Sequence, residues 1–257
     1  MRKEIISINI RSEKLHSILY LPEINDLPIN NFIFPLVIRI NGMPGVSPED
    51  DENRFARHFI ENNMAYFTFD HQGVRESSGI FTYYDAQANI ERVIDQLVQH
   101  SEINPFKIGL LGESFGGAMA FCNAVRDHRV QCLAIRSPVF DTEIIPKNPL
   151  FKYFAKYLTQ NKQMRFPEGD LKEAYAEQTK QYNPNKLANK LTKPVYIIAG
   201  NKDQLFPENG FHQLFKKIKS DNKKIDIIDG ADHNFTNNNL FLEMCRNLTK
   251  FFNKYLQ

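Results

Sequence analysis

The fold is decided by the stretch Gly112-Glu113-Ser114-Phe115-Gly116-Gly117. Residues 107–111 before it form a short apolar run typical of a buried strand, and residues 118–125 after it have the apolar spacing of a helix packed on a sheet. A Gly-x-Ser-x-Gly between a strand and a helix predicts a nucleophile elbow, a sharp turn that holds the serine in a strained backbone conformation. Ser114 is therefore the candidate nucleophile.

The composition is that of an ordinary soluble protein. The 257 residues are 42% hydrophobic and 24% charged, enough for a substantial core in one large domain or two smaller ones. The net charge of +2 is too small to indicate nucleic-acid binding. Cys122, Cys132 and Cys245 lie in apolar segments without paired spacing, which indicates reduced thiols and a cytoplasmic location. We expect no secretory leader, because residues 1–5 meet polar side chains too soon for an apolar region, and no membrane span, because no apolar run is long enough.

Strand and helix patterns alternate along most of the chain. Two β-rich runs at 5–10 and 15–20 predict a hairpin, and a helix is expected to begin at Ser47. Further strands are predicted at 34–40, 65–69, 107–111, 132–136, 195–199 and 225–228. The alternation predicts an α/β fold with a mostly parallel eight-stranded sheet and helices on both faces.

The alternation stops for about fifty residues after Pro138, which is too long for a plain loop. Residues 139–192 fit helix faces rich in Phe and Tyr. We predict that they form a helical cap inserted after the sixth strand, on an α/β core made of residues 1–138 and 193–257. Packing of the cap on the core would explain its aromatic residues, but an apolar wall for a substrate would explain them equally well. The candidate substrate-binding residues are Phe151, Phe154 and Tyr157.

The carboxyl ends of the predicted strands carry the other candidate catalytic groups. Serine needs a base to take its proton, and histidine titrates in the right range. Of the seven histidines, His233 is the candidate base, because it follows the last strand. His71, which follows the fourth strand, is the alternative. Asp203 follows the seventh strand and gives the chain order Ser, Asp, His. Its carboxylate would fix the tautomer of the imidazole and offset its developing charge. Asp141, just past the sixth strand, is the alternative acid.

An oxyanion intermediate needs two N–H donors beside the nucleophile. The amide of Phe115 supplies one. We place the other on Met43, because Gly42 lets the backbone fold in and Pro44 has no N–H to give. The alternative is that this Asn-Gly-Met-Pro-Gly segment is simply a tight turn. No phosphate-binding glycine motif and no metal-ligand spacing is present in the sequence, so we expect no cofactor and no metal site.

The chain resembles an α/β-hydrolase of the serine-esterase type over essentially its whole length. The segment 69–77, Phe-Asp-His-Gln-Gly-Val-Arg-Glu-Ser, resembles that fold's loop after the fourth strand, usually Asp-x-Arg-Gly-x-Gly-x-Ser. Gln72 replaces the arginine of this motif, and Arg75 replaces its second glycine. Asn41-Gly42 stands where many relatives have His-Gly. The cap resembles those of bacterial carboxylesterases close to feruloyl (cinnamoyl) esterases and monoacylglycerol lipases.

The resemblance and the candidate triad together predict a serine esterase. The expected binding partner is the substrate itself, a small apolar or aromatic carboxylic ester. We expect it to be cleaved through an acyl-enzyme on Ser114. A thioesterase or a peptidase with the same triad is the alternative, because the fold does not separate these activities. A non-catalytic scaffold that binds a small ligand or a protein is a further alternative. The sequence leaves a homodimer open and indicates no nucleic-acid partner.

Overall fold

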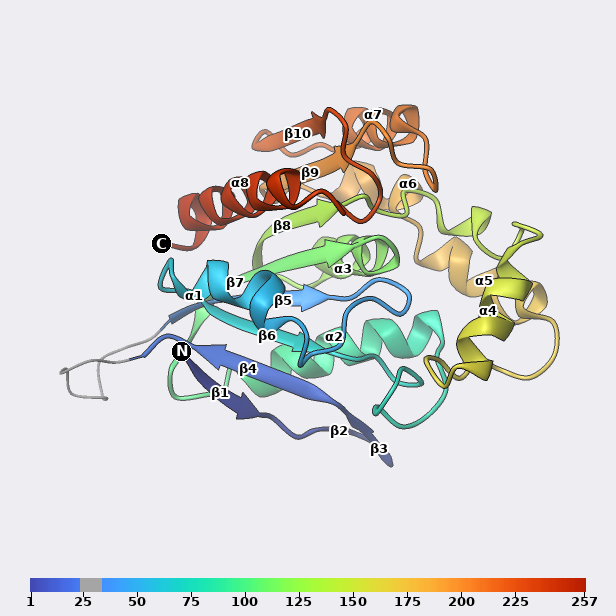
Figure 1. Ribbon diagram of the computed structural model, residues 1–257, viewed down its shortest axis with the longest axis horizontal. Coiled ribbons are helices and arrows are strands. Elements are labelled where there is room, and N and C mark those ends of the chain that lie inside the picture. The colour runs from blue at the N-terminus through green and yellow to red at the C-terminus, as the bar shows by residue number, and fades with distance from the viewer. Residues whose placement is uncertain (24–33) are drawn as a thin grey trace.

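The computed structural model describes residues 1–23 and 34–257 (Figure 1). Its centre is an eight-stranded sheet with the order β1-β4-β6-β5-β7-β8-β9-β10. Its strands are β1 (Arg2–Ile5), β4 (Ser17–Leu21), β5 (Phe34–Ile40), β6 (Ala65–Phe69), β7 (Ile103–Glu113), β8 (Val130–Arg136), β9 (Val195–Gly200) and β10 (Lys223–Ile228). The β1–β4 and β4–β6 pairs are antiparallel, and the other five pairs are parallel. The prediction of a mostly parallel eight-stranded sheet is therefore confirmed.

Helices cover both faces of this sheet (Figure 1). The helices of one face are α1 (Arg57–Ile60) and α8 (Asn238–Leu256), and those of the other are α2 (Tyr83–Leu97), α3 (Phe115–Arg126) and α7 (Glu208–Lys217). In strand β5, every residue except Arg39 is apolar, because the strand is buried on both faces. Val37 packs in the cluster that contains Phe252 of α8, whereas Ile38 packs in the cluster that contains Phe121 of α3. A strand buried on both faces cannot alternate polar with apolar residues.

The stretch between β8 and β9 is helical. It contains α4 (Phe151–Gln160), α5 (Leu171–Gln181) and α6 (Pro184–Leu187), and Figure 1 shows α4 and α5 beyond the carboxyl ends of the strands. Tyr175 Oη of α5 donates to the carbonyl of Phe81 at 2.8 Å, which ties α5 to the segment before α2. The division into a cap at 139–192 and a core at 1–138 and 193–257 stays a prediction, and residues 24–33 of that core lie outside the described part.

Several element bounds differ from the predictions, and three differences are the largest. The predicted hairpin is divided, because β1 pairs with β4 in the main sheet while β2 (Ile8–Ile10) pairs with β3 (Glu13–Leu15) in a small separate sheet. Strand β7 begins four residues earlier than predicted, at Ile103. The helix expected from Ser47 begins only at Glu52, as a short π-helical segment before α1.

The late start of this helix follows from Asp51. The Asp51 carbonyl accepts the first backbone hydrogen bonds of the segment, from Arg54, Phe55 and Ala56. Its carboxylate is fixed in the core by Tyr66 Oη at 2.7 Å. The residues between Ser47 and Asp51 form turns instead.

The three cysteines are free and buried, as predicted. Burial raises the pKa of each thiol, which keeps all three protonated at neutral pH. In the part of the chain that the structure describes, no helix is both long and apolar enough to cross a membrane.

Candidate active site

Ser114 lies at the junction of β7 and α3 with φ 51° and ψ −118°. A positive φ in a residue other than glycine costs about 1–3 kcal/mol and is retained only where the surroundings hold it. Here the Ser114 N–H donates to Arg136 O at 2.9 Å, and its carbonyl accepts from Gly117 at 3.0 Å and Val139 at 2.9 Å. The strained turn predicted from the glycine spacing is present.

Glycines bring the loop after β5 against this turn. A Cβ on Gly116 would lie 2.1 Å from the carbonyl oxygen of Ile40, so only glycine permits this approach. A Cβ on Gly42 would lie 3.4 Å from Ser114 Cβ. The loop that carries the predicted second oxyanion donor therefore starts beside the predicted nucleophile.

Asp203 and His233 form a hydrogen-bonded pair after the adjacent strands β9 and β10. His233 Nδ1 lies 2.8 Å from Asp203 Oδ2, and the Asp203 side chain is 1% exposed. Asp203 Oδ1 accepts from the amides of Leu205 at 2.8 Å and Phe206 at 3.0 Å. Burial by itself would raise the pKa of Asp203, but the hydrogen bond from His233 and the two amides outweigh it and lower that pKa. The carboxylate is thus ionised and oriented toward the imidazole.

The rival residues have other partners. Asp141 Oδ1 accepts from the amide of Glu143 at 3.0 Å and from Asn183 Nδ2 at 2.7 Å, which caps the turn after β8. His71 is enclosed in the core with Nδ1 3.3 Å from Asn89 Oδ1, and burial lowers its pKa to about 4. Neither rival contacts the Asp203–His233 pair through any hydrogen bond of the described residues.

Arg136 connects the serine to the histidine. Its carbonyl accepts from the Ser114 N–H, and its Nη1 donates to the carbonyl of His233. The described residues contain no hydrogen bond between Ser114 Oγ and His233 Nε2. Such catalytic contacts are often long in ligand-free structures and tighten in the Michaelis complex. The structure thus pairs Asp203 with His233. Arg136 contacts the backbone of both His233 and Ser114.

The two amides predicted to bind the oxyanion are both free to donate. The Phe115 N–H opens helix α3, where the first amides have no partner within the helix. Within residues 1–23 and 34–257, neither the Phe115 N–H nor the Met43 N–H donates to another group. The helix terminus adds a favourable field for negative charge beside Ser114.

A network of buried charges, which the sequence patterns did not predict, lies behind the elbow. Glu113 Oε1 accepts from Arg136 Nε at 3.0 Å, and Glu113 Oε2 forms an ion pair with Arg39. Arg39 Nη1 also lies 2.6 Å from Asp51 Oδ2. A signal was available, because Arg39 stands inside the apolar run 34–40, and a charge in a strand buried on both faces needs a partner.

The three candidate substrate-binding residues do not share one face of α4. Phe151 is buried and packs on Phe166 with ring centroids 6.3 Å apart. Phe154 and Tyr157 are 42% and 60% exposed. Together with Leu150 and Tyr153 they form an exposed apolar row at helical spacing.

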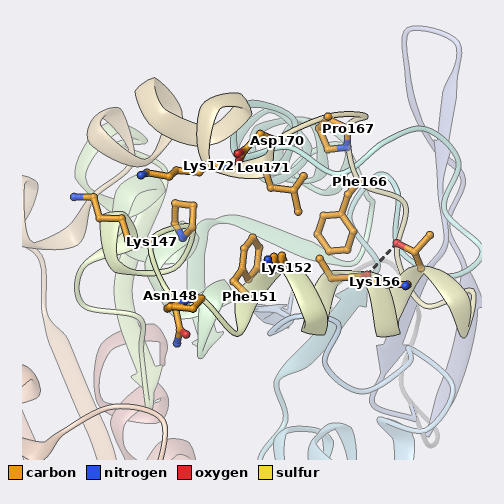
Figure 2. Close-up of a pocket in the computed structure, with 15 residues that line it drawn as sticks. Lys147, Asn148, Phe151, Lys152, Lys156, Phe166, Pro167, Asp170, Leu171 and Lys172 are labelled. Carbon is orange, nitrogen blue, oxygen red and sulfur yellow. Dashed lines mark hydrogen bonds between the residues drawn. The ribbon is translucent and has the colours of Figure 1, made fainter.

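A cavity of about 520 Å³ lies between α4 and α5 (Figure 2). Phe151, Phe166 and Leu171 line it together with four lysines. Phe154 and Tyr157 do not line it. The five residues predicted for the triad and the oxyanion hole do not line it either. The cavity therefore belongs to the segment between β8 and β9 rather than to the elbow.

Comparison with known proteins assigns the chain to a family. A family model described as the prolyl oligopeptidase family matches residues 72–257. The chain belongs to the prolyl oligopeptidase family. The matched range contains Ser114, Asp203 and His233, whereas Met43 lies before it.

Two curated relatives are bacterial proteins. The chain is 24% identical over 275 residues to a 31.7 kDa protein from the traX-finO intergenic region of Escherichia coli, covering 90% of this chain and 94% of the relative. It is 28% identical over 173 residues to the protein YfhR of Salmonella typhi, covering 67% of this chain and 56% of YfhR.

Solved structures confirm the α/β-hydrolase fold. Est1E from Butyrivibrio proteoclasticus, solved with ferulic acid bound, matches with a TM-score of 0.77 at 22% identity, covering 97% of this chain and 98% of that one. A monoacylglycerol lipase from Paleococcus ferrophilus matches with a TM-score of 0.68 at 18% identity, covering 94% and 99%. The expected resemblance to bacterial esterases and lipases of this fold is confirmed.

Proposed function

We propose that the chain is a serine esterase that hydrolyses a carboxylic ester through an acyl-enzyme on Ser114. The observation that carries the proposal is the 2.8 Å contact between Asp203 Oδ2 and His233 Nδ1, at the carboxyl ends of the strands, where the elbow also holds Ser114. Family membership and fold support a serine hydrolase. Among the solved neighbours are an esterase with ferulic acid bound and a monoacylglycerol lipase, and these names favour an ester substrate.

In the acylation step, His233 Nε2 takes the proton of Ser114 Oγ as that oxygen attacks the ester carbonyl carbon. The carbonyl oxygen becomes an oxyanion and accepts from the Met43 and Phe115 amides. Asp203 stays ionised and stabilises the imidazolium. The imidazolium then protonates the leaving alcohol oxygen as its bond to the acyl carbon breaks.

Deacylation repeats these roles with water as the nucleophile. His233 takes a proton from water, which attacks the acyl carbon of the Ser114 ester through a second oxyanion at the same two amides. Collapse of this intermediate releases the carboxylic acid and returns the proton to Ser114 Oγ. No metal or cofactor is needed for either half of the reaction.

The exposed row on α4 is our proposed apolar wall for the substrate. Leu150, Tyr153 and Tyr157 are each more than half exposed, at 69%, 62% and 60%. Aromatic side chains exposed in a row at this spacing gain free energy when an apolar group covers them. This favours an aromatic or medium-chain ester, with residues 139–192 acting as the cap.

A panel of nitrophenyl esters of graded acyl length, with an aryl ester and a thioester, tests the proposal. Wild type should hydrolyse an ester in preference to the thioester, and Ser114→Ala should lose this turnover. Turnover that survives in Ser114→Ala would refute an acyl-enzyme on this serine. Preference for the thioester would replace the esterase by a thioesterase.

A peptidase is the second candidate, because the family model is described by an oligopeptidase. The same triad cleaves an amide when the leaving amine is positioned for protonation by His233. A prolyl nitroanilide peptide added to the panel separates the two. Faster release from the peptide than from every ester would make the peptidase the better description. A folded wild type that cleaves nothing in the panel would favour the non-catalytic binder.

A further inference from the structure

The guanidinium of Arg75 joins the loop after β6 to the loop after β5. Its Nε donates to Asp70 Oδ2 at 2.9 Å, and its Nη2 forms an ion pair with the other oxygen of that carboxylate. The guanidinium also donates to the carbonyls of Gly45 at 3.1 Å, Val46 at 3.2 Å and Pro44 at 3.4 Å. One side chain thus holds three consecutive carbonyls of a single loop.

These are the only hydrogen bonds to residues 43–46 from the part of the chain that the structure describes. The same loop begins beside the nucleophile, since a Cβ on Gly42 would lie 3.4 Å from Ser114 Cβ. Met43, whose N–H is the proposed second oxyanion donor, immediately precedes the first carbonyl that Arg75 holds. The guanidinium therefore contacts the loop directly after the proposed donor.

The backbone of Arg75 is held in a conformation that favours glycine. Its φ is 40°, and the motif that this segment resembles has glycine at this position. Its N–H donates to Gln163 O at 3.0 Å, and its carbonyl accepts from Arg165 Nη1 at 3.1 Å. Glycine would relieve the backbone cost but could not make the five side-chain contacts. A strained backbone that is retained at a residue with a specific set of side-chain contacts indicates that the side chain has a function.

We propose that Arg75 is a positioning residue. It orients the Met43 N–H toward the oxyanion that forms when Ser114 Oγ attacks the substrate carbonyl. Arg75 acts through the carbonyls of residues 44–46 and does not touch the substrate. The inference rests on the proposed function, since it takes Met43 as an oxyanion donor. An oxyanion develops only after attack, so a misdirected donor lowers kcat and leaves KM nearly unchanged.

The test variant is Arg75→Gly, which removes the guanidinium and also relieves the positive φ. A second variant, Arg75→Gly with Asp70→Asn, removes the buried carboxylate that would otherwise lose its partner. The matched control is Arg2→Gly. Arg2 also pairs with a carboxylate, that of Glu102, and donates to a loop carbonyl, that of Pro22, but it lies on the edge strand β1.

Three readouts are measured on each variant: kcat and KM on the best ester, the rate of limited proteolysis by thermolysin within residues 42–46, and rescue by guanidinium ion. We expect kcat to fall about 10²-fold in both Arg75 variants with KM nearly unchanged. We also expect faster proteolysis within residues 42–46, and partial recovery of kcat with guanidinium ion but not with sodium. Arg2→Gly should match wild type in all three.

Two results would overturn the inference. One is an unchanged kcat in folded Arg75→Gly while wild type turns over through Ser114. The other is equal proteolysis of residues 42–46 in wild type and variant, a readout that needs no activity. If wild type shows no turnover that depends on Ser114, the proposed function fails, and the proteolysis experiment still decides whether Arg75 orders the loop.

Discussion

Replacement of Glu113 by glutamine tests the buried charges behind the elbow. The Glu113 side chain is 3% exposed and lies between Arg136 and Arg39. Burial by itself would raise the pKa of Glu113, but the charges of the two arginines outweigh it and lower the pKa from 4.5 to about 2. Glutamine keeps the shape, removes the charge and turns an amide NH₂ toward a guanidinium.

The size and pH dependence of the effect follow from this pKa. A shift of this size corresponds to about 3 kcal/mol of folding free energy at neutral pH, similar to the cost of breaking a buried ion pair. Because the folded-state pKa lies below the unfolded one, the unfolded chain takes up the proton first as the pH falls. The contribution is therefore complete above about pH 4.5 and disappears as the pH falls toward about 2. At about pH 3.5, roughly 2 kcal/mol should remain.

Urea unfolding of wild type and Glu113→Gln at neutral pH and at about pH 3.5 measures this directly. The variant should be less stable by about 3 kcal/mol at neutral pH, and the difference should shrink by about 1 kcal/mol in acid. The control is Glu177→Gln, because Glu177 is 77% exposed and forms a surface ion pair with Lys180. A difference below about 1 kcal/mol at neutral pH, or one that grows in acid, would refute the reasoning.

Three further predictions concern the site and its support. Asp203→Asn should lower kcat by about 10³–10⁴-fold in an ester assay while Asp141→Asn has little effect, and the opposite order would move the acid to the loop after β8. Gly116→Ala should lower the thermal unfolding midpoint strongly, because its Cβ would lie 2.1 Å from Ile40 O, and an unchanged midpoint would contradict this close approach. Tyr157→Ala should raise KM for an aryl ester about tenfold and leave KM for an acetate ester unchanged; equal effects on both esters would remove Tyr157 from the substrate wall.

The elements that the sequence predicts best are those with two-sided burial. The predicted bounds of β5 and β6 agree with the structure, because every residue of both strands is buried and all but Arg39 and Thr68 are apolar. The start of β7 was placed too late, because residues 103–106 include Asn104, Pro105 and the 80% exposed Phe106 and so carry no buried pattern. The start of the helix after Ser47 was wrong because the contacts that fix Asp51 come from distant strands.

At the site, local patterns indicated the reacting groups but not what holds them. The glycine spacing around Ser114 and the order of Asp203 and His233 can be read from a single segment or strand end. The contacts of Glu113 with Arg39, and of Arg75 with residues 44–46, join segments distant in the chain. Such long-range partners depend on the fold and are not encoded in local spacing. Arg75 was noticed only as a departure from a motif.

The central claim is that Ser114 is a nucleophile activated by His233 beside two amide donors. The most direct measurement is the intact mass of the protein after exposure to a fluorophosphonate, followed by peptide mapping. Wild type should gain a single adduct on Ser114, Ser114→Ala should gain none, and His233→Ala should react far more slowly. A folded wild type that stays unmodified, or an adduct on another residue, would contradict the account.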